Sequence, residues 1–209
     1  MIAVVDYGAG NIHSVARALV RVGATFAVTD DPAVVASADA IVLPGVGAAA
    51  DTMQGLRNAR VDEPVVAAIM RGVPYLGICM GLQVLFDRSE EDDETPCLGV
   101  LSGDVVRFPT GLEVPHMGWN QVRQVEDSPL FTGVPQDSNF YFVHSYYARP
   151  ADSARVSGTT DYGLEFTSVV RRDHLYATQF HPEKSGLVGL RIYANFIRLA
   201  GQTPAPEFD

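Results

Sequence analysis

Short apolar runs alternate with amphipathic segments along the first half of the chain. The runs that have the length and composition of buried strands are residues 2–6, 26–29 and 39–43. Residues 12–22 place Val15, Leu19 and Val22 on one helical face, and Gly23 follows as a stop. Residues 61–71 predict a second helix with an apolar inner face. Strands buried on both faces and separated by helices predict a mostly parallel sheet, flanked by helices, with right-handed crossovers.

The pattern changes beyond residue 99 to short β-type runs. These runs are residues 103–108, 139–147, 164–171 and 175–180. They indicate an antiparallel β section in the second half, attached to the parallel core. Residues 189–200 predict a closing amphipathic helix. We therefore expect one α/β domain over residues 1–201 and a flexible C-terminal tail at 202–209.

Composition and charge narrow the classes of function. The 209 residues carry a formal net charge of −10, and Lys184 is the only lysine among 15 cationic side chains. Without a basic stripe to displace counterions from phosphates, nucleic acid is not an expected partner. The sequence has no apolar stretch of membrane-spanning length and no signal-peptide pattern at its start, so we expect a cytoplasmic protein without a membrane partner. In that reducing compartment Cys79 and Cys97 are expected as free thiols.

Cys79 lies in a motif that predicts a particular turn of the backbone. Residues Gly77 to Gly81 read G-x-C-x-G between an apolar strand-like run at 73–76 and an apolar helix-like run at 82–86. This pattern is typical of a nucleophile elbow, a tight strand-to-helix turn that exposes one side chain. A Cβ at either glycine would clash where the chain reverses. A helix N-terminus at Cys79 would favour the thiolate, so the motif favours a catalytic thiol over a buried structural cysteine.

A cysteine nucleophile needs a base, and the base needs an acceptor that orients it. Among the five histidines, His181 ends the apolar run at 175–180 and is followed by Pro182 and Glu183. Residues two apart on extended backbone point to the same side, so His181 and Glu183 can act on one point. Taken alone, this pattern also fits a strand-end histidine near a surface glutamate.

Together, the segments at 77–83 and 179–183 resemble the two motifs of the triad-type glutamine amidotransferases. In that family a cysteine attacks the side-chain amide of glutamine, ammonia leaves, and water hydrolyses the glutamyl thioester. The resemblance implies that Cys79 is the nucleophile, His181 the general acid and base, and Glu183 its orienter. It also implies the flavodoxin-like α/β fold of that family.

The P-G-V-G segment at 44–47 is similar to the oxyanion loop of the same family. Glycines on both sides of Val46 permit its peptide to rotate and present an N–H group. As a lone histidine on a β-type run, His144 fits a buried core residue equally well. The residues that the resemblance implies for the oxyanion hole are Val46, Gly47 and Met80, and those for substrate binding are Gly45, Gln83, His144, Ser145 and Tyr146.

Three further segments point to one branch of the family. Residues 6–12, 114–120 and 139–146 together resemble the glutaminase subunits of imidazole glycerol phosphate synthases, which act in histidine biosynthesis. This resemblance covers residues 2–200. The G-A-G turn in the first segment lacks the third glycine of a dinucleotide loop, because His13 stands at that position. We therefore reject a dinucleotide site there.

That resemblance implies a partner, a separate cyclase subunit built as a (β/α)8 barrel that forms a heterodimer with this chain. Ammonia would cross the interface and react on the barrel, giving imidazole glycerol phosphate and an aminoimidazole carboxamide ribotide. It implies no cofactor and no metal. Asn11, Trp119 and Tyr141 are the candidates for the interface and its gate, although Trp119 also fits an aromatic cap on the β section. The isolated subunit is expected to be a poor glutaminase that the partner's bound substrate activates.

Other functions stay open at this point. The nearest is the glutaminase component of another triad amidotransferase, such as anthranilate or aminodeoxychorismate synthase, and the 114–120 segment argues against it. A non-catalytic regulatory subunit is disfavoured because Cys79, His181 and Glu183 are all present. A cysteine peptidase on a similar scaffold is disfavoured by the 44–47 loop and by Gln83. Cys97 and the acidic loop at 89–94 have no function that the sequence indicates.

Overall fold

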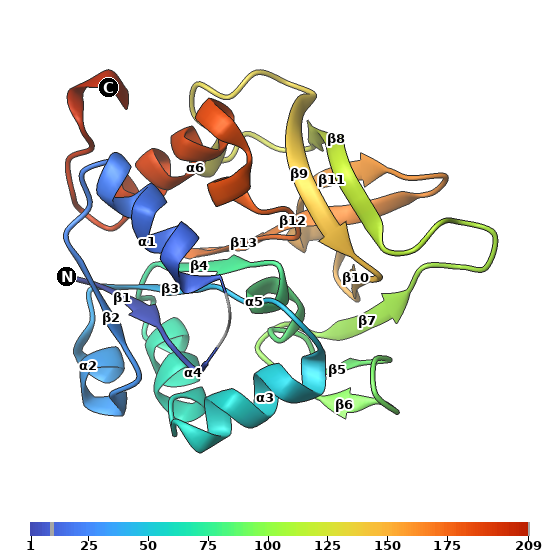
Figure 1. The fold of residues 1–209 in the computed structure, drawn as a ribbon, viewed down its shortest axis with the longest axis horizontal. Coiled ribbons are helices and arrows are strands. Elements are labelled where there is room, and N and C mark those ends of the chain that lie inside the picture. Colours follow the sequence, from blue (N-terminus) through green and yellow to red (C-terminus); the bar gives the residue numbers. More distant parts are fainter. Residues whose placement is uncertain (9–10, 209) are drawn as a thin grey trace.

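The computed structural model describes residues 1–8 and 11–208, and its strands join into one 13-stranded sheet. The G-A-G turn discussed above lies partly outside the described residues, at 9–10. Five neighbouring strands are parallel and form the centre of the fold (Figure 1). In spatial order they are β2 (Phe26–Thr29), β1 (Ile2–Val5), β3 (Ala40–Leu43), β4 (Tyr75–Ile78) and β13 (Leu175–Thr178). The expected parallel core is confirmed.

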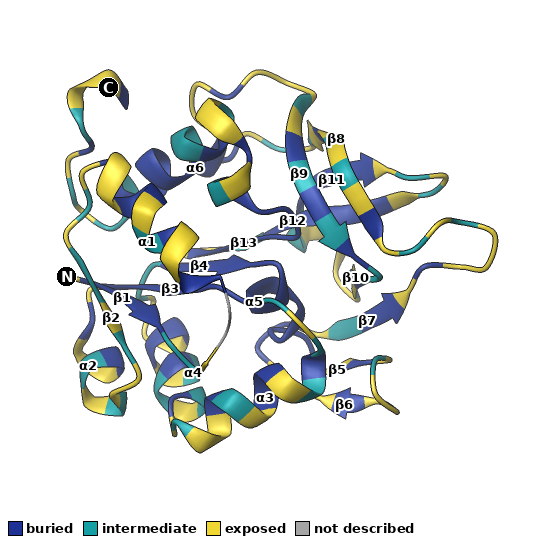
Figure 2. Ribbon diagram, in the orientation of Figure 1, coloured by how far each residue is buried: buried dark blue, intermediate teal, exposed yellow. Residues whose placement is uncertain are grey.

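Helices cover both faces of this centre. On one face lie α1 (Ile12–Arg21) and α6 (Gly186–Leu199), and on the other lie α2 (Pro32–Ser37), α3 (Ala49–Asn58) and α4 (Asp62–Met70) (Figure 1). Side chains of a strand point alternately to the two faces, so Ile2 and Val4 join one hydrophobic core and Ala3 and Val5 join the other. Figure 2 shows the central strands buried and the outer faces of the helices exposed.

The second half of the chain adds the expected antiparallel section. The sheet continues from β13 through β12 (Glu165–Arg172), β10 (Tyr146–Pro150), β7 (Gly103–Arg107) and the short strands β5 (Arg88–Ser89) and β6 (Thr95–Pro96). A branch runs from β12 through β11 (Val156–Asp161) and β8 (His116–Gln124) to β9 (Ser138–His144). The expected run at 139–147 is thus two strands, because the chain bends at Ser145. Single 3-10 turns complete the fold at η1 (Pro129–Phe131), η2 (Ser153–Arg155), η3 (Pro182–Lys184) and η4 (Pro206–Phe208).

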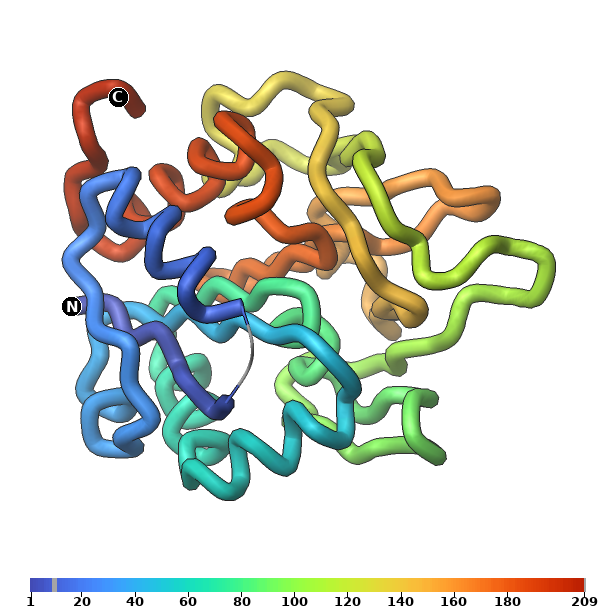
Figure 3. Tube along the Cα trace, viewed as in Figure 1, coloured from blue at the N-terminus to red at the C-terminus, as the bar shows by residue number. Residues whose placement is uncertain are grey.

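The C-terminal segment differs from the flexible tail that the sequence predicts. Residues 202–208 run back along the N-terminal half, as the red end of the tube in Figure 3 shows. The Ala205 N–H donates to the Val22 carbonyl over 2.8 Å, and the Gln202 side chain bonds both backbone groups of Thr25. Phe208 is buried in the core beside α1. An aromatic side chain that finds an apolar site therefore orders this segment.

The helix after the elbow is shorter than expected. It is α5 (Met80–Gln83), a single turn, and the chain from Val84 onward continues as turns rather than as a helix. One turn carries little of the macrodipole of a long helix, so the expected support of the thiolate by a helix N-terminus is weak here. In the part of the chain that the structure describes, no helix is long and apolar enough to cross a membrane.

The elbow itself has the strained geometry that the motif predicts. Cys79 has φ of 53° and ψ of −104°, a conformation that a residue with a Cβ rarely adopts. A Cβ on Gly81 would lie 1.9 Å from the Leu43 carbonyl oxygen of β3, and one on Gly77 would lie 2.3 Å from the Gly81 carbonyl oxygen. The expected steric need for both glycines is thus confirmed, because backbone atoms occupy the space that a side chain would take.

Gly81→Ala should therefore disrupt the fold more than an alanine at another buried glycine. We expect it to lower the free energy of unfolding by about 3 kcal/mol, because a backbone carbonyl has to move. Gly158→Ala is the matched control, since its Cβ would meet only valine side chains at 3.0–3.2 Å, and its expected cost is about 1 kcal/mol. Denaturant unfolding of both variants measures this. Equal losses would show that the contact with β3 does not restrict the elbow.

Candidate active site

The parallel pairing of β4 with β13 brings the two sequence motifs together. Ile78 pairs with Thr178, and the ladder continues one residue further because the Cys79 N–H donates to the Thr178 carbonyl over 2.8 Å. Cys79 and His181 consequently lie at the carboxyl edge of adjacent parallel strands, where ligands bind in α/β sheets. Both side chains are buried, with 5% and 0% of each residue exposed.

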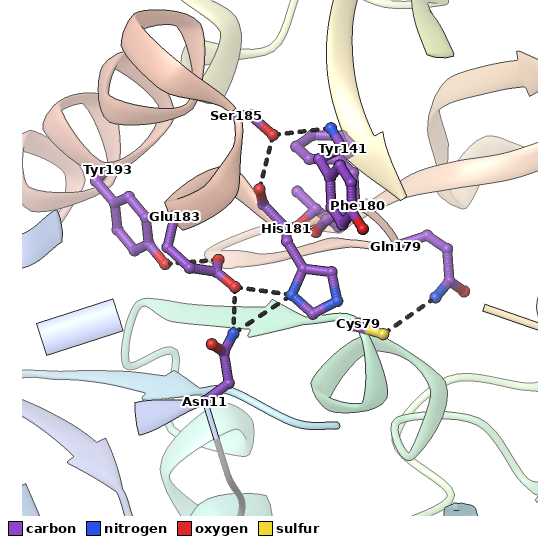
Figure 4. Close-up of polar contacts among 10 residues, drawn as sticks. Asn11, Cys79, Tyr141, Gln179, Phe180, His181, Glu183, Ser185 and Tyr193 are labelled. Carbon is purple, nitrogen blue, oxygen red and sulfur yellow. Dashed lines mark hydrogen bonds and ion pairs between the residues drawn. The ribbon is translucent and has the colours of Figure 1, made fainter. Parts of the chain in front are cut away.

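A cluster of hydrogen bonds holds the Glu183 carboxylate beside His181 (Figure 4). Its Oε1 lies 2.7 Å from His181 Nδ1 and also accepts a hydrogen bond from the Asn11 side-chain amide. Its Oε2 lies 3.3 Å from the hydroxyl of Tyr193 in α6. A fully buried carboxylate is costly unless donors surround it, and these three donors stabilise its charged form.

These contacts fix which nitrogen of the imidazole carries the proton. A carboxylate oxygen only accepts, so His181 Nδ1 donates and Nε2 is left as the free base. His181 Nε2 is buried and has no hydrogen-bond partner among the described residues. Burial alone would lower the pKa of His181, but the Cys79 thiolate and the Glu183 carboxylate outweigh it and raise that pKa to about 10. His181 can therefore take the thiol proton and hold it as an imidazolium.

The backbone of His181 is fixed from the side of β9. Its N–H donates to the Tyr141 carbonyl over 2.9 Å. The Ser185 hydroxyl donates to the His181 carbonyl over 2.7 Å and accepts from the Tyr141 N–H over 3.0 Å (Figure 4). Tyr141 of β9 is thus linked to the His181 N–H directly and to the His181 carbonyl through the Ser185 hydroxyl.

A cavity of about 260 Å³ opens above the thiol. Its volume is below the roughly 300–1,000 Å³ of pockets for drug-sized ligands, which suits a substrate of the size of an amino acid. Gly45, Asn11 and Glu183 do not line it. The expected site residues that do line it are Val46, Gly47, Cys79, Met80, Gln83, His144, Ser145, Tyr146 and His181.

The loop at 44–47 follows β3 and borders this cavity through Val46 and Gly47. Gly45 packs against the elbow, since a Cβ there would lie 2.5 Å from Met80 Cβ and 2.7 Å from the Tyr7 hydroxyl. Gly47 has φ of 93°, a left-handed conformation that favours glycine. The loop therefore needs its first glycine for space and its second for backbone conformation.

Gln83 and Glu91 contribute polar groups to the lining of the cavity. Gln83 donates through Nε2 to the Tyr146 carbonyl over 2.9 Å, while its buried Oε1 has no partner in the described part of the chain. Glu91 lies in the run that the sequence predicts as a solvated acidic loop, yet it is half-buried and lines the cavity. Its Oε2 accepts the Ala49 N–H over 2.8 Å, and burial raises its pKa. These oxygens can bind the ammonium group of an amino acid, a role for Glu91 that its position in an acidic run did not indicate.

His144 lines the cavity and is joined by a hydrogen bond to His116, which lies behind it in β8. His144 Nδ1 donates to the Tyr146 carbonyl over 2.8 Å, so its Nε2 accepts, over 2.9 Å, from His116 Nδ1. His116 Nε2 in turn accepts from the Asn120 amide over 3.2 Å. Burial lowers the pKa of His116 to about 4 and that of His144 to about 3. Every ring nitrogen has a partner only while both rings are neutral.

The expected interface residues lie in different surroundings. Trp119 is 58% exposed and packs edge-to-face on Tyr141, its partner across β8 and β9. The Lys184 ammonium lies 5.6 Å from the centre of the Tyr141 ring. Asn11 differs from the expectation, because it is only 7% exposed and its amide is used on Glu183. It therefore contacts Glu183 beside His181, and the interface role expected for it stays a prediction.

Cys97 is a free thiol apart from this site, as is expected of a reduced cysteine. It is half-buried, and burial raises its pKa to about 11. Within residues 1–8 and 11–208, no cluster of three or more His, Cys, Asp or Glu side chains is arranged to hold a metal ion.

Comparison with known proteins gives a consistent relationship. The model of the family described as glutamine amidotransferase class-I matches residues 3–199. The chain is 54% identical to the imidazole glycerol phosphate synthase subunit HisH of Dehalococcoides mccartyi (strain CBDB1), over 96% of this chain and 98% of that protein. It is 51% identical to the subunit HisH of Acinetobacter baylyi, over 94% and 97%.

A solved structure described as a glutamine amidotransferase superposes with a TM-score of 0.76, covering 96% of this chain and 99% of that one. The sequence identity of that pair is 21%, so the likeness is one of fold. It agrees with the parallel sheet and flanking helices described above.

The histidine pair makes a prediction about stability and pH. Both histidines have a folded-state pKa below the ordinary value of about 6.5, so the unfolded chain binds their protons first as the pH falls. Stability is then lost from about pH 6.5 downward, by about 1–2 kcal/mol for each histidine between pH 7 and pH 5.

Urea unfolding at both pH values tests this with His116→Gln, whose amide can still donate to His144. We expect its loss between pH 7 and pH 5 to be about 1–2 kcal/mol smaller than that of the unaltered chain. His174→Gln, at an exposed turn, is the control and should lose as much as the unaltered chain. Identical losses for all three would contradict the neutral pair.

Proposed function

Because this chain belongs to the class-I glutamine amidotransferase family, we propose that it is the glutaminase subunit of an imidazole glycerol phosphate synthase. It hydrolyses L-glutamine and supplies ammonia to the synthase reaction of histidine biosynthesis. The observation that carries the proposal is the buried line of Cys79, His181 and Glu183 beside a cavity of amino-acid size. The high identity to HisH subunits over nearly the full length assigns this branch of the family.

The chemistry follows from the free Nε2 of His181. It takes the proton of Cys79, and the thiolate attacks the side-chain amide carbon of glutamine. The carbonyl oxygen becomes an oxyanion, for which we propose the backbone N–H groups of the Val46–Gly47 segment and of Met80 as donors. His181 then passes its proton to the nitrogen, the C–N bond breaks, and ammonia leaves a glutamyl thioester on Cys79.

The same imidazole serves in the second half of the reaction. With its proton gone to ammonia, His181 can deprotonate a water molecule that attacks the thioester. Glutamate leaves, and the thiolate and imidazolium are restored. Glu183 keeps Nδ1 protonated throughout, so that Nε2 alone exchanges protons. For the substrate's ammonium group we propose the Glu91 carboxylate and the free Gln83 Oε1, with Ser145 and Tyr146 along the wall.

The partner would dock on the surface of Trp119, Tyr141 and Lys184. Trp119 and Met117 are 58% and 62% exposed on the same side of β8, a hydrophobic pair typical of the centre of an interface. The hydrogen bond from the His181 N–H to the Tyr141 carbonyl supports this proposal, because it joins the surface to the proposed triad. The proposed partner is a separate cyclase subunit with a (β/α)8 barrel, forming a heterodimer in the cytoplasm, and ammonia would pass across this surface.

The proposed function predicts stimulation by the partner. Purified chain is mixed with a candidate cyclase subunit, and glutamate release is measured with and without the cyclase's ribotide substrate. We expect release to rise at least about 10-fold when partner and ribotide are both present, the range of a typical coupling free energy between sites. Release that stays the same in every mixture would refute the assignment to this synthase.

The division of labour predicts a selective loss in Cys79→Ala. Turnover of the complex with glutamine should fall at least about 10³-fold, because no thioester can form, while turnover with supplied ammonia should be unchanged. Cys97→Ala is the matched control, since that thiol does not line the cavity, and should retain both activities. A parallel fall of both activities in Cys79→Ala would contradict the proposal.

A further inference from the structure

Gln179 is fully buried two residues before the catalytic histidine, and the proposed mechanism gives it no role. Its N–H donates to the Ser168 carbonyl of β12 over 2.8 Å, which fixes its backbone. The pairing of Ile78 with Thr178 places Gln179 level with Cys79, and its Nε2 lies 3.6 Å from Cys79 Sγ. In Figure 4 the sulfur lies between the His181 ring and this amide.

The orientation of the Gln179 amide follows from its neighbours. The Tyr146 carbonyl can only accept, so Gln83 must direct its NH2 group toward it. The second N–H of that NH2 group meets Gln179 Oε1 over 3.0 Å. Gln179 therefore presents its oxygen to Gln83 and its own NH2 group to the sulfur. A reversed amide would set two NH2 groups against each other and leave only an oxygen beside the thiol.

A hydrogen-bond donor beside Cys79 Sγ stabilises the thiolate more than the neutral thiol. A neutral thiol is a weak acceptor, whereas a thiolate accepts a charge-assisted hydrogen bond that is roughly twice as strong as a neutral one. The amide thus stabilises the thiolate within a buried site that offers little water for solvation. The positive charge of the His181 imidazolium acts on the other side of the sulfur and also favours the thiolate.

We propose that Gln179 is a further catalytic residue, whose side-chain amide donates to Cys79 Sγ and maintains the reactive thiolate. The proposal rests on the glutaminase function of Cys79. The hydrogen bond weakens once the sulfur forms the C–S bond of the thioester, because that sulfur carries no charge. It strengthens again when water attacks the acyl carbon, the C–S bond breaks and the thiolate returns. Gln179 itself gains and loses no proton.

Alkylation of Cys79 by iodoacetamide tests this role without glutamine or partner. Rates between pH 5 and pH 9 are measured by mass spectrometry of the peptides that contain Cys79 and Cys97. Gln179→Met keeps the length of the side chain but removes the donor. We expect its rate profile for Cys79 to move up by about one pH unit, because the thiolate is less stable. Its rate at pH 7 should fall by about threefold only, because a more basic thiolate is also more nucleophilic and partly offsets the smaller thiolate fraction.

Gln179→Glu is the second variant, because it is isosteric and places an acceptor beside the sulfur. Its profile should move further up than that of Gln179→Met. Alkylation of Cys97 is the internal control and should be the same in all three proteins. In the complex we expect Gln179→Met to lower kcat with glutamine and to leave its KM nearly unchanged.

Superimposable alkylation profiles for the unaltered chain and Gln179→Glu would overturn the proposal, and so would a profile that moves down. That result would leave the proposed function intact, because glutamate release with the partner is measured separately. If the partner did not stimulate glutamate release by the unaltered chain while the alkylation profiles of the Gln179 variants still moved up, the proposed function would be wrong and the role of Gln179 beside the thiol would stand.

Discussion

The hydrogen bond between the Cys79 N–H and the Thr178 carbonyl is the contact on which the site depends. It continues the parallel ladder of β4 and β13 past the end of both strands, and so it brings Cys79 and His181 to the same edge of the sheet. A slip of one residue in this register would turn every side chain of β13 to the opposite face. The 13-stranded sheet, with a hydrophobic core on each face, makes such a slip costly. The pairing of the strands in the sheet therefore determines the positions of Cys79 and His181 relative to each other.

Buried polar groups in this protein are arranged as directed chains of donors and acceptors. One chain runs from Asn120 through two neutral histidines to the Tyr146 carbonyl, and a second runs from Gln83 through Gln179 to the thiol. The Tyr146 carbonyl only accepts, from His144 in the first chain and from Gln83 in the second, and this fixes the direction of the bonds in both chains. The negative charges, in contrast, are held by donors from separate elements, as Glu183 is by Asn11 and Tyr193. The neutral hydrogen-bond chains thus fix the orientation of their side chains, whereas the donors around Glu183 stabilise its negative charge.

The parts that the sequence predicts are those set by local pattern. The central strands follow from apolar runs, and the elbow follows from the spacing of its glycines. What escaped prediction depends on contacts between distant segments. Helix α3 and strand β8 carry few large apolar residues, and β8 has one exposed side and one side that is buried or half-buried. Glu91 points inward because it meets the Ala49 N–H, and Phe208 is ordered because α1 offers it an apolar site. The residues next to Glu91 and Phe208 in the sequence do not indicate either contact.

The close contact of Gly81 with the Leu43 carbonyl has a mechanical consequence for the loop that follows β3. The carbonyl lies under the elbow with no room for even a methyl group, so β3 and the turn at Cys79 are in direct backbone contact. The loop begins at the very next residue, Pro44, and its left-handed Gly47 lies three residues beyond. Gly45 is also packed against Met80, so a rotation of the Val46 peptide would have its pivot after Gly45. Such a hinge can reshape the rim of the cavity while the sulfur stays in place.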